Sequence, residues 1–349
     1  MSTLSSPGHR RAGGRRARPR SRAAQVSGSR IHDLIGDIGE LEAAGGAGVL
    51  HLTPEQDLEI SNLGKRFFPR GGYTKGDLMA YYASVSPYLL PAIADRPLVM
   101  KRFPNGVGGM SFYQQRAPED PPDGVRVESV ADEGLKTQRR LVGGDLATLL
   151  YVVQLGAISI DPWHSRVQSV GYADYAIVDL DPGPRASFRR VVDVALWVGD
   201  ELDHLGLHGV PKTSGSSGIH IVLPLVAGTP NETARLVAEL VATRVAERHP
   251  RETTVTRWVQ SRPTSSVYVD FLQNIRGKTV ASVYSARATP EATVSAPLRW
   301  SELRPDLDPR AFTIESMAAR MREVGDLWRE GMRKPNDPRR LLGNARRDA

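Results

Sequence analysis

The sequence predicts an α+β fold, and three of its features lead to that class. Short apolar runs bounded by Gly and Pro are typical of strands, and they are interspersed with stretches whose apolar residues recur at helical spacing. The two kinds of element do not alternate in the regular way that produces a parallel sheet. No internal repeat is visible in the 349 residues, and 40% of them are hydrophobic, which is enough for a sizeable core.

Turn residues and apolar spacing indicate the elements of the first half of the chain. A helix over residues 77–90 is expected because its apolar and aromatic side chains fall on one face, with Thr74 or Gly76 near its start. A Pro-Asn-Gly turn between two apolar runs predicts a hairpin. In order, the expected elements are a short helix and a Gly/Ala-rich link within residues 31–52, a strand and turn over 58–65, the helix over 77–90, a hairpin of 96–103 with 110–114, and a helix over 145–155.

The second half of the chain begins with an apolar run that ends at Asp179, Asp181 and the pair Pro182-Gly183, which indicates a buried strand. Ser187 is a suitable N-cap, so a helix is expected to follow it. The remaining expected elements are a strand over 219–225, a helix over 232–247 and a strand over 267–273.

The positive charge of the chain is concentrated at its two ends. The formal net charge is +7, but residues 1–30 hold eight arginines and no acid, and residues 331–349 hold six basic and two acidic residues. The part between them carries 32 basic against 37 acidic side chains. We therefore expect a disordered basic tail over 1–30, a linker with a short helix over 31–54, one domain over 55–330, and a basic C-terminal tail over 331–349. The N-terminal tail is either an arm that contacts phosphates or a solubilising extension.

Cysteine content and hydropathy exclude several function classes. The chain has no cysteine, which rules out disulfides, thiolate metal sites and cysteine nucleophiles. No apolar run approaches the roughly 20 residues of a membrane span, and no signal-peptide segment is visible. We expect a cytoplasmic protein without a membrane partner.

Asp179 and Asp181 are the first candidates for chemistry. Residues i and i+2 of a strand point to the same face, so the two carboxylates project together at the end of the strand. Two like charges so close are costly unless a cation neutralises them, and Mg²⁺ and Mn²⁺ prefer such oxygen ligands. Asp270, on a later strand, is a candidate third ligand, or alternatively a solvated acid at a sheet edge. Three carboxylates around two divalent ions suit phosphoryl or nucleotidyl transfer.

A glycine-rich turn and a basic–aromatic group are candidates for nucleotide and nucleic-acid contacts. In Ser-Gly-Ser-Ser-Gly-Ile-His at 214–220, the glycines let backbone N–H groups approach phosphate oxygens, and Ser214 and His220 add donors. An ordinary hairpin turn is the alternative. Basic side chains beside aromatic ones are suited to pair with phosphates and stack on bases, unless the aromatics belong to the core. The candidates of this kind are Lys101, Arg102, Phe103, Phe112, Tyr113 and Lys278.

A series of short motifs follows in one order from about residue 55 to 305. They are Asn-Leu-Gly-Lys at 62–65, Tyr-Thr-Lys-Gly-Asp at 73–77, Arg-Pro-Leu-Val-Met-Lys-Arg-Phe-Pro-Asn-Gly-Val at 96–107, Ser-Phe-Tyr-Gln at 111–114, Asp-Pro-Trp at 161–163, Val-Asp-Leu-Asp-Pro-Gly at 178–183, Lys-Thr-Ser-Gly at 212–215, Gly-Ile-His at 218–220, Val-Asp-Phe-Leu-Gln-Asn at 269–274 and Tyr-Ser-Ala-Arg at 284–287. The series resembles the polymerase domain of bacterial ligase D, within the archaeo-eukaryotic primase superfamily.

The resemblance implies a primase-polymerase fold, with mixed and antiparallel sheets flanked by helices and two subdomains around a central active-site cleft. It implies that the catalytic residues, which bind two divalent ions (Mn²⁺ or Mg²⁺), are Asp179, Asp181 and Asp270. It implies nucleotide contacts for Lys101, Phe112, Tyr113, Ser214, His220, Lys278 and Arg287. Lys65 and Lys75 match lysines that, in the family, hold the 5′-phosphate of a gapped or broken DNA end.

Two positions depart from the family pattern. Asp161 stands where many members have His, and Ser216 or Ser217 stands where many have a Lys in the glycine turn. An acid at position 161 repels a triphosphate unless it binds metal or turns away, so these departures bear on nucleotide affinity. No ligase Lys-x-Asp-Gly motif is found, and we expect a stand-alone, nucleoid-associated member of the family.

The expected activity is DNA-directed addition of ribo- or deoxyribonucleotides (NTP or dNTP) to a primer 3′-hydroxyl at gapped, nicked or broken DNA ends. The expected process is non-homologous end joining, with Ku and an ATP-dependent DNA ligase as partners. Two alternatives stay open: a catalytically weak DNA-end-binding module that recruits partners, and a nucleotide-sugar transferase, which also uses Asp-x-Asp with Mn²⁺. The residues do not separate repair from priming, or templated from untemplated addition.

Overall fold

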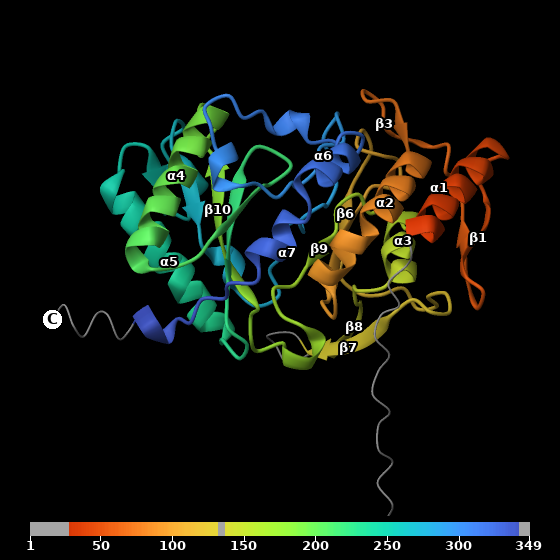
Figure 1. The fold of residues 1–349 in the computed structure, drawn as a ribbon, viewed down its shortest axis with the longest axis horizontal. Helices are drawn as coiled ribbons and strands as arrows, with labels where there is room; N and C mark the ends of the chain where they lie inside the picture. Colours follow the sequence, from red (N-terminus) through yellow and green to blue (C-terminus); the bar gives the residue numbers. More distant parts are fainter. Residues whose placement is uncertain (1–27, 132–136, 342–349) are drawn as a thin grey trace, which may run out of the picture.

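Two lobes make up the fold, and they meet along the middle of the molecule (Figure 1). The computed structural model describes residues 28–131 and 137–341. One lobe holds the helices of the first half of the chain, and the other holds a five-stranded sheet with two long helices. Helices combined with mostly antiparallel sheets confirm the predicted α+β class.

Short strands surround three helices in the N-terminal lobe. The helices are α1 (Gly28–Ala43), α2 (Lys75–Ile93) and α3 (Leu146–Gln154). Three antiparallel pairs are formed by β1 (Gly48–Thr53) with β2 (Gln56–Ile60), β3 (Arg66–Phe68) with β4 (Tyr73–Thr74), and β7 (Val127–Ala131) with β8 (Thr137–Leu141). A three-stranded sheet has the order β6 (Phe112–Gln114), β5 (Leu98–Arg102) and β9 (Asp161–Pro162). The pairing of β5 with β6 confirms the hairpin predicted across the Pro-Asn-Gly turn.

The linker expected over residues 31–54 is instead part of the folded lobe. α1 is sixteen residues long and buries Ile31, Leu34 and Ile38, and it packs against α2. The Gly/Ala-rich link is only a tight turn between α1 and β1. α2 begins where expected, because Thr74 Oγ1 accepts a hydrogen bond from Asp77 N and the Asp77 carboxylate accepts one from Thr74 N.

The second lobe is built on a sheet with the strand order β11-β12-β10-β14-β13. Its strands are β11 (Val210–Thr213), β12 (Ile219–Pro224), β10 (Tyr175–Pro182), β14 (Val267–Asp270) and β13 (Thr253–Thr254). Every pairing is antiparallel except that of β13 with β14. The helices α4 (Phe188–Leu205) and α5 (Asn231–Arg248) both contact β10. Ser187 is the N-cap of α4, as predicted.

The C-terminal part of the chain returns to both lobes. α6 (Met317–Val324) and α7 (Leu327–Gly331) follow a long segment with little regular structure. Asn336 is buried and its side chain bonds the backbone of His208 and Pro224, so the basic C-terminal tail expected over 331–349 is held in the fold up to residue 341. Residues 342–349 of that tail and residues 1–27 of the N-terminal tail expected over 1–30 lie outside the described residues, whereas residues 28–30 are the start of α1. No helix among those described is long and apolar enough to cross a membrane.

Replacing Asn274 by Ala is expected to lower the free energy of unfolding by about 2–4 kcal/mol, because two buried backbone groups of the central strand lose their partner. Asn274 Oδ1 accepts from Ile177 N at 2.7 Å, and Nδ2 donates to Ile177 O at 2.8 Å. Urea denaturation measures the change. A control substitution at exposed Gln260 to Ala is expected to have no effect, and an equally small change at Asn274 would contradict this role.

Candidate active site

The register of the central sheet brings three carboxylates together. Asp179 on β10 pairs directly with Asp270 on β14, its neighbour on one side, and with His220 on β12 on the other. Asp181 lies two residues further along β10 and so projects to the same face as Asp179. One oxygen of each of the three acids lies within 4.8 Å of the others. Residues that are ninety positions apart in the chain thus form one acidic cluster.

Burial and the neighbouring carboxylates make Asp179 and Asp181 costly to ionise. Burial, followed by the neighbouring Asp181 and Asp270, raises the pKa of Asp179 well above its usual range. Burial and Asp270 likewise raise the pKa of Asp181, although Arg262 and Arg287 oppose the shift. Within the described chain Asp179 Oδ1 is buried without a hydrogen bond. The triad thus offers three carboxylate oxygens as ligands, and Asp179 Oδ1 is buried without a partner. This set of ligands fits Mg²⁺ or Mn²⁺.

Asp270 is held in place by three donors. Tyr268 Oη (3.1 Å) and Leu272 N (2.7 Å) donate to its Oδ1, and Gln273 Nε2 donates to its Oδ2 at 3.0 Å. The guanidinium of Arg262 lies over the Tyr268 ring, 3.4 Å from its centroid. Arg262 follows an exposed segment that contains Trp258 and Val259. The orientation of Asp270 therefore depends on a side chain that packs under an exposed basic and apolar loop.

The glycine-rich turn lies against the end of β10. Ser214 Oγ accepts hydrogen bonds from Ser216 N and Gly218 N, which closes the turn. A Cβ at Gly218 would lie 2.3 Å from Leu180 O, so only glycine allows this approach. Arg287 Nη1 donates to Ser214 O at 2.9 Å. The predicted residues Ser214 and Arg287 are thus in contact, and Arg287 influences the pKa of Asp179 and Asp181.

His220 and Lys212 form a buried pair beside the triad. His220 Nε2 lies 3.3 Å from Asp179 Oδ1, and Lys212 Nζ lies 2.7 Å from His220 Nδ1. Burial, and then the Lys212 and Arg287 charges, lower the pKa of His220 well below its usual range, so the ring is neutral. Burial and Arg287 lower the pKa of Lys212 to about 7. The sequence reasoning did not select Lys212, although its place in Lys-Thr-Ser-Gly, directly opposite His220 on β11, was the available signal.

The aromatic candidates are exposed and paired with cations. Phe112 and Tyr113, on the edge strand β6, are 47% and 69% exposed, so they are not core residues. Arg102 lies over the Phe112 ring, and Lys101 Nζ lies 5.5 Å from the Tyr113 centroid. Lys278 is exposed on the turn after the 3₁₀ helix at Leu272–Asn274, and no hydrogen bond within the described ranges joins it to the other predicted residues.

Lys65 and Lys75 lie in a separate basic cluster of the N-terminal lobe. Lys75 is buried, and its Nζ donates to Ser61 O at 2.8 Å and to Gln154 Oε1 at 2.7 Å. Burial, followed by the charges of Lys65 and Arg102, lowers its pKa to about 8. Lys65 Nζ donates to Asn105 Oδ1 at 2.6 Å. Arg102, which the sequence placed among the basic side chains suited to pair with phosphates, is close enough to Lys75 to influence its pKa.

Asp161 does not join the triad. The cluster consists of Asp179, Asp181 and Asp270 and does not include Asp161. The Oδ2 of Asp161 instead accepts a hydrogen bond from Ser159 Oγ at 2.7 Å. Burial raises its pKa, and Arg287, Lys212 and Lys101 oppose that shift. Asp161 therefore lies near Lys101 and Arg287, the two of these cations that are predicted to contact a nucleotide, and its negative charge opposes theirs.

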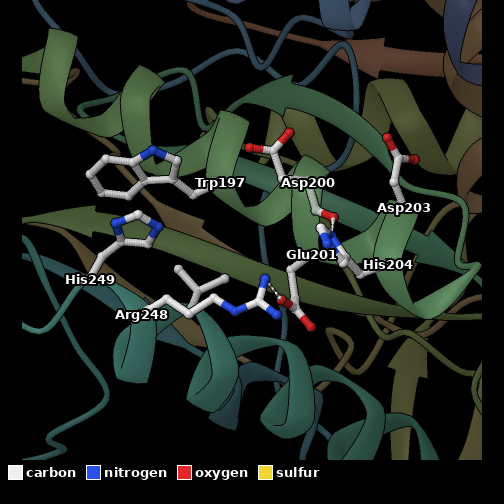
Figure 2. Close-up of a pocket in the computed structure, with 8 residues that line it drawn as sticks. Trp197, Asp200, Glu201, Asp203, His204, Arg248 and His249 are labelled. Atoms are coloured by element: carbon white, nitrogen blue, oxygen red, sulfur yellow. Dashed lines mark hydrogen bonds and ion pairs between the residues drawn. The ribbon is translucent and has the colours of Figure 1, made fainter.

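A pocket of about 340 Å³ between α4 and α5 is distinct from this site (Figure 2). The rings of Trp197 and His249 stack 3.7 Å apart. Buried Glu201 pairs with Arg248 at 2.7 Å and with Arg244. None of the predicted site residues lines this pocket. Glu201 of α4 is thus paired with arginines of α5, which is typical of a helix–helix contact.

An acidic triad on adjacent antiparallel strands, with basic side chains around it, is the arrangement of a nucleotidyltransferase site. The family model of the LigD primase-polymerase domain matches residues 74–328. The chain belongs to this family.

Curated relatives and a solved structure agree with that assignment. The bifunctional non-homologous end joining protein LigD of Bacillus subtilis is 33% identical over 282 residues, which are 80% of this chain and 45% of the relative. The multifunctional LigD of Mycobacterium tuberculosis H37Rv is 33% identical over 284 residues, 78% of this chain and 37% of the relative. The polymerase domain of Mycobacterium tuberculosis ligase D in complex with DNA aligns with a TM-score of 0.74 and 30% identity, over 81% of this chain and all of that one. The chain thus spans less than half the length of these curated relatives.

Proposed function

We propose that this protein is a metal-dependent, DNA-directed nucleotidyltransferase that adds nucleotides to a primer 3′-hydroxyl at gapped, nicked or broken DNA ends. One observation carries the proposal: the strand register clusters Asp179, Asp181 and Asp270 beside a turn to which Arg287 is bonded. The similar solved domain is in complex with DNA, which supports DNA as the substrate.

Each group of side chains has a distinct part in the proposed reaction. The triad would hold two divalent ions, Mn²⁺ or Mg²⁺, which lower the pKa of the attacking hydroxyl and neutralise the leaving group. The primer 3′-oxygen forms a bond to the α-phosphorus while the bond to the pyrophosphate oxygen breaks. The residues proposed to bind the nucleotide are Lys101, Phe112, Tyr113, Ser214, His220, Lys278 and Arg287.

The proposed setting is DNA repair by non-homologous end joining at the nucleoid. The relatives that share most of this chain are end-joining proteins by name. We propose that Ku and an ATP-dependent DNA ligase act on the same ends. Ribonucleotides and deoxyribonucleotides are both proposed substrates, because no described contact identifies a group that reads the sugar 2′ position.

A catalytically weak end-binding module is the second candidate function. Asp161 favours it, because this partly buried acid lies among Arg287, Lys212 and Lys101, where it lowers the positive charge available to a triphosphate. The charges that shift the pKa of Lys75, in contrast, are those of Lys65 and Arg102, and both are basic. Binding to DNA ends without nucleotide addition would be the consequence.

A primer-extension panel separates the proposed functions. Gapped DNA with a 5′-phosphate is incubated with Mn²⁺ or Mg²⁺ and with NTPs, dNTPs or nucleotide sugars. The proposal expects primer extension with one pyrophosphate released per nucleotide added. Tight end binding without extension would favour the recruitment module. Sugar transfer without DNA binding would favour the nucleotide-sugar transferase.

Recognition of a 5′-phosphate is expected to depend on pH through Lys75. We propose that Lys65 and Lys75 bind this phosphate, and Lys75 is charged only below its pKa of about 8. The preference for 5′-phosphorylated over 5′-hydroxyl DNA should therefore fall as pH rises from 7 to 9. Fluorescence anisotropy with the two DNAs measures it.

The double variant Lys65→Ala/Lys75→Ala should lose most of that preference, about tenfold or more, since each lysine would supply a charge-assisted hydrogen bond. It should also lose the pH dependence. Lys334→Ala, exposed and far along the chain from this cluster, serves as the matched control. A preference that persists unchanged in the double variant would refute the assignment.

A further inference from the structure

The loop between β13 and β14 exposes two large apolar side chains that the proposed function does not use. Trp258 is 78% exposed and Val259 is 73% exposed. Residues 256–262 are called the Trp258 loop below, and its residues 257–261 line a pocket of about 510 Å³. Large aromatic side chains are usually buried for most of their surface, so this degree of exposure indicates a binding surface.

Arg262 fixes the shape of the Trp258 loop and its place beside the triad. Its Nε donates to Thr256 O at 2.8 Å, and its Nη2 donates to Arg257 O at 2.9 Å, so both ends of the loop are joined. The same guanidinium lies over the ring of Tyr268, whose hydroxyl donates to Asp270. The loop is therefore held at a set position relative to a proposed metal ligand.

The register of the sheet places this loop and the glycine-rich turn on opposite sides of Asp181. On the β14 side, Tyr268 pairs directly with Asp181, and Arg262 of the loop packs on Tyr268. On the β12 side, a Cβ at Gly218 would lie 3.7 Å from Asp181 Oδ1. The turn, the acid on β10 and the loop thus follow one another across the sheet.

In-line transfer at this site requires the primer to approach from the side of the loop. The attacking and the leaving oxygen lie on opposite sides of the α-phosphorus. We assign the leaving pyrophosphate to the turn at 214–218 and to Arg287, which is bonded to that turn. The primer 3′-oxygen must then come from the β14 side, so the primer nucleotides that precede it lie near the Trp258 loop.

The charge of this segment favours a nucleic-acid strand over a protein as the partner. Residues 253–269 contain two arginines and no acid. Arg257 is exposed directly beside Trp258. An exposed ring stacks on any base, and a neighbouring guanidinium pairs with the backbone phosphate, which is how single strands are bound without regard to sequence.

We infer that the Trp258 loop binds the primer strand near its 3′ end, with Trp258 stacked on a base and Arg257 paired with a backbone phosphate. The inference rests on the proposed function, which supplies the primer and the direction of attack. It concerns the strand that is extended, whereas Lys65 and Lys75 are assigned to the 5′-phosphate on the far side of the gap.

Fluorescence anisotropy with gapped DNA that carries a 5′-hydroxyl tests this contact without a contribution from the 5′-phosphate. Trp258→Ala should weaken binding about tenfold, as for the loss of one stacked base, and Trp258→Phe should restore most of the affinity. The control Tyr172→Ala removes a ring that is 48% exposed near the other end of β10 and should bind like the wild type. Wild-type affinity of Trp258→Ala would overturn the inference and favour a protein partner for the loop.

Abasic DNA identifies the strand that Trp258 contacts. One series of gapped DNAs lacks a single base at successive positions from the primer 3′ end, and a second series lacks the opposite template base. One primer position should cost the wild type about as much affinity as Trp258→Ala does, and should cost that variant nothing more. The same pattern in the template series alone, or in neither series, would show that the assignment to the primer is wrong.

The salt dependence of binding separates the two contacts of the loop. Arg257→Ala should reduce the slope of log K against log salt by about 0.7–0.9, the value for one phosphate contact, whereas Trp258→Ala should leave the slope unchanged. An unchanged slope in Arg257→Ala would contradict the phosphate contact.

These binding measurements need no nucleotide, so their outcome is distinguishable from failure of the proposed function. A wild type that contacts the primer through Trp258 but never extends it would refute nucleotidyl transfer and support the binding surface. Primer extension with the same KM for the primer in the wild type and in Trp258→Ala would refute the inference alone.

Discussion

Asp179→Asn is expected to reduce the rate of primer extension by a factor of about 10³ or more, because a lost metal ligand removes several kcal/mol of transition-state stabilisation. Asp179 lies between Asp270 and His220 in the sheet, so its substitution disturbs both sides of the proposed centre. Asn has nearly the same shape and keeps the strand intact. The loss should appear in kcat, since DNA binding is assigned to the distant basic cluster.

Single-turnover extension of a 5′-phosphorylated gapped primer measures this effect. Asp181→Asn should lose activity on a similar scale. The matched control is Asp306→Asn, whose carboxylate is exposed and pairs only with nearby Arg304 among the described residues. Anisotropy should show equal affinity of all four proteins for the gapped DNA. Retention of wild-type extension by Asp179→Asn would remove the triad from the reaction.

Without metal, replacing Asp179 by Asn is expected to raise the stability of the protein, although it lowers the rate of primer extension. The pKa of Asp179 is raised in the folded protein, so its contribution to stability is full below the unfolded pKa and is lost as pH rises through the folded pKa. In Asp179→Asn the side chain cannot ionise, so the variant does not lose this stability as the pH rises. The melting temperature of the variant should therefore exceed that of the metal-free wild type at pH 8, by about 2–4 °C for each 1 kcal/mol relieved.

Divalent cations should reverse that order. At a hundred times its dissociation constant, a bound ion stabilises the wild type by about 2.7 kcal/mol, and the variant should gain much less. Because the aspartates must be ionised to bind the cation, the gain should be larger at pH 8 than at pH 5. Differential scanning fluorimetry with and without Mn²⁺ tests both statements. Equal gains for the two proteins would place the cation elsewhere.

Local sequence patterns were sufficient to predict several parts of the fold. The hairpin of β5 and β6, the N-cap Ser187 and the start of α2 near Thr74 follow from turn and cap chemistry, which acts over a few residues. The same-face relation of Asp179 and Asp181 follows from the two-residue period of a strand. These features need no knowledge of the rest of the chain.

Features that depend on long-range pairing could not be predicted. The register that sets Asp179 against Asp270 joins strands ninety residues apart, and no local signal specifies it. A short helix was expected within residues 31–52, but the sixteen-residue length of α1 and its place in the folded lobe were not, because its apolar face is completed only by α2. The exposure of Phe112 and Tyr113 follows from the place of β6 at a sheet edge, and the partners of Lys212 come from three separate segments.

The central claim is that the triad performs nucleotidyl transfer with divalent ions, and one titration tests it most directly. Primer extension and pyrophosphate release are recorded together as Mn²⁺ is added to the wild type and to Asp179→Asn/Asp181→Asn/Asp270→Asn. We expect both products to appear in equal amounts in the wild type, to rise with Mn²⁺, and to be absent from the triple variant. Equal extension by the two proteins, or extension by the wild type without added divalent ions and in the presence of chelator, would contradict the account.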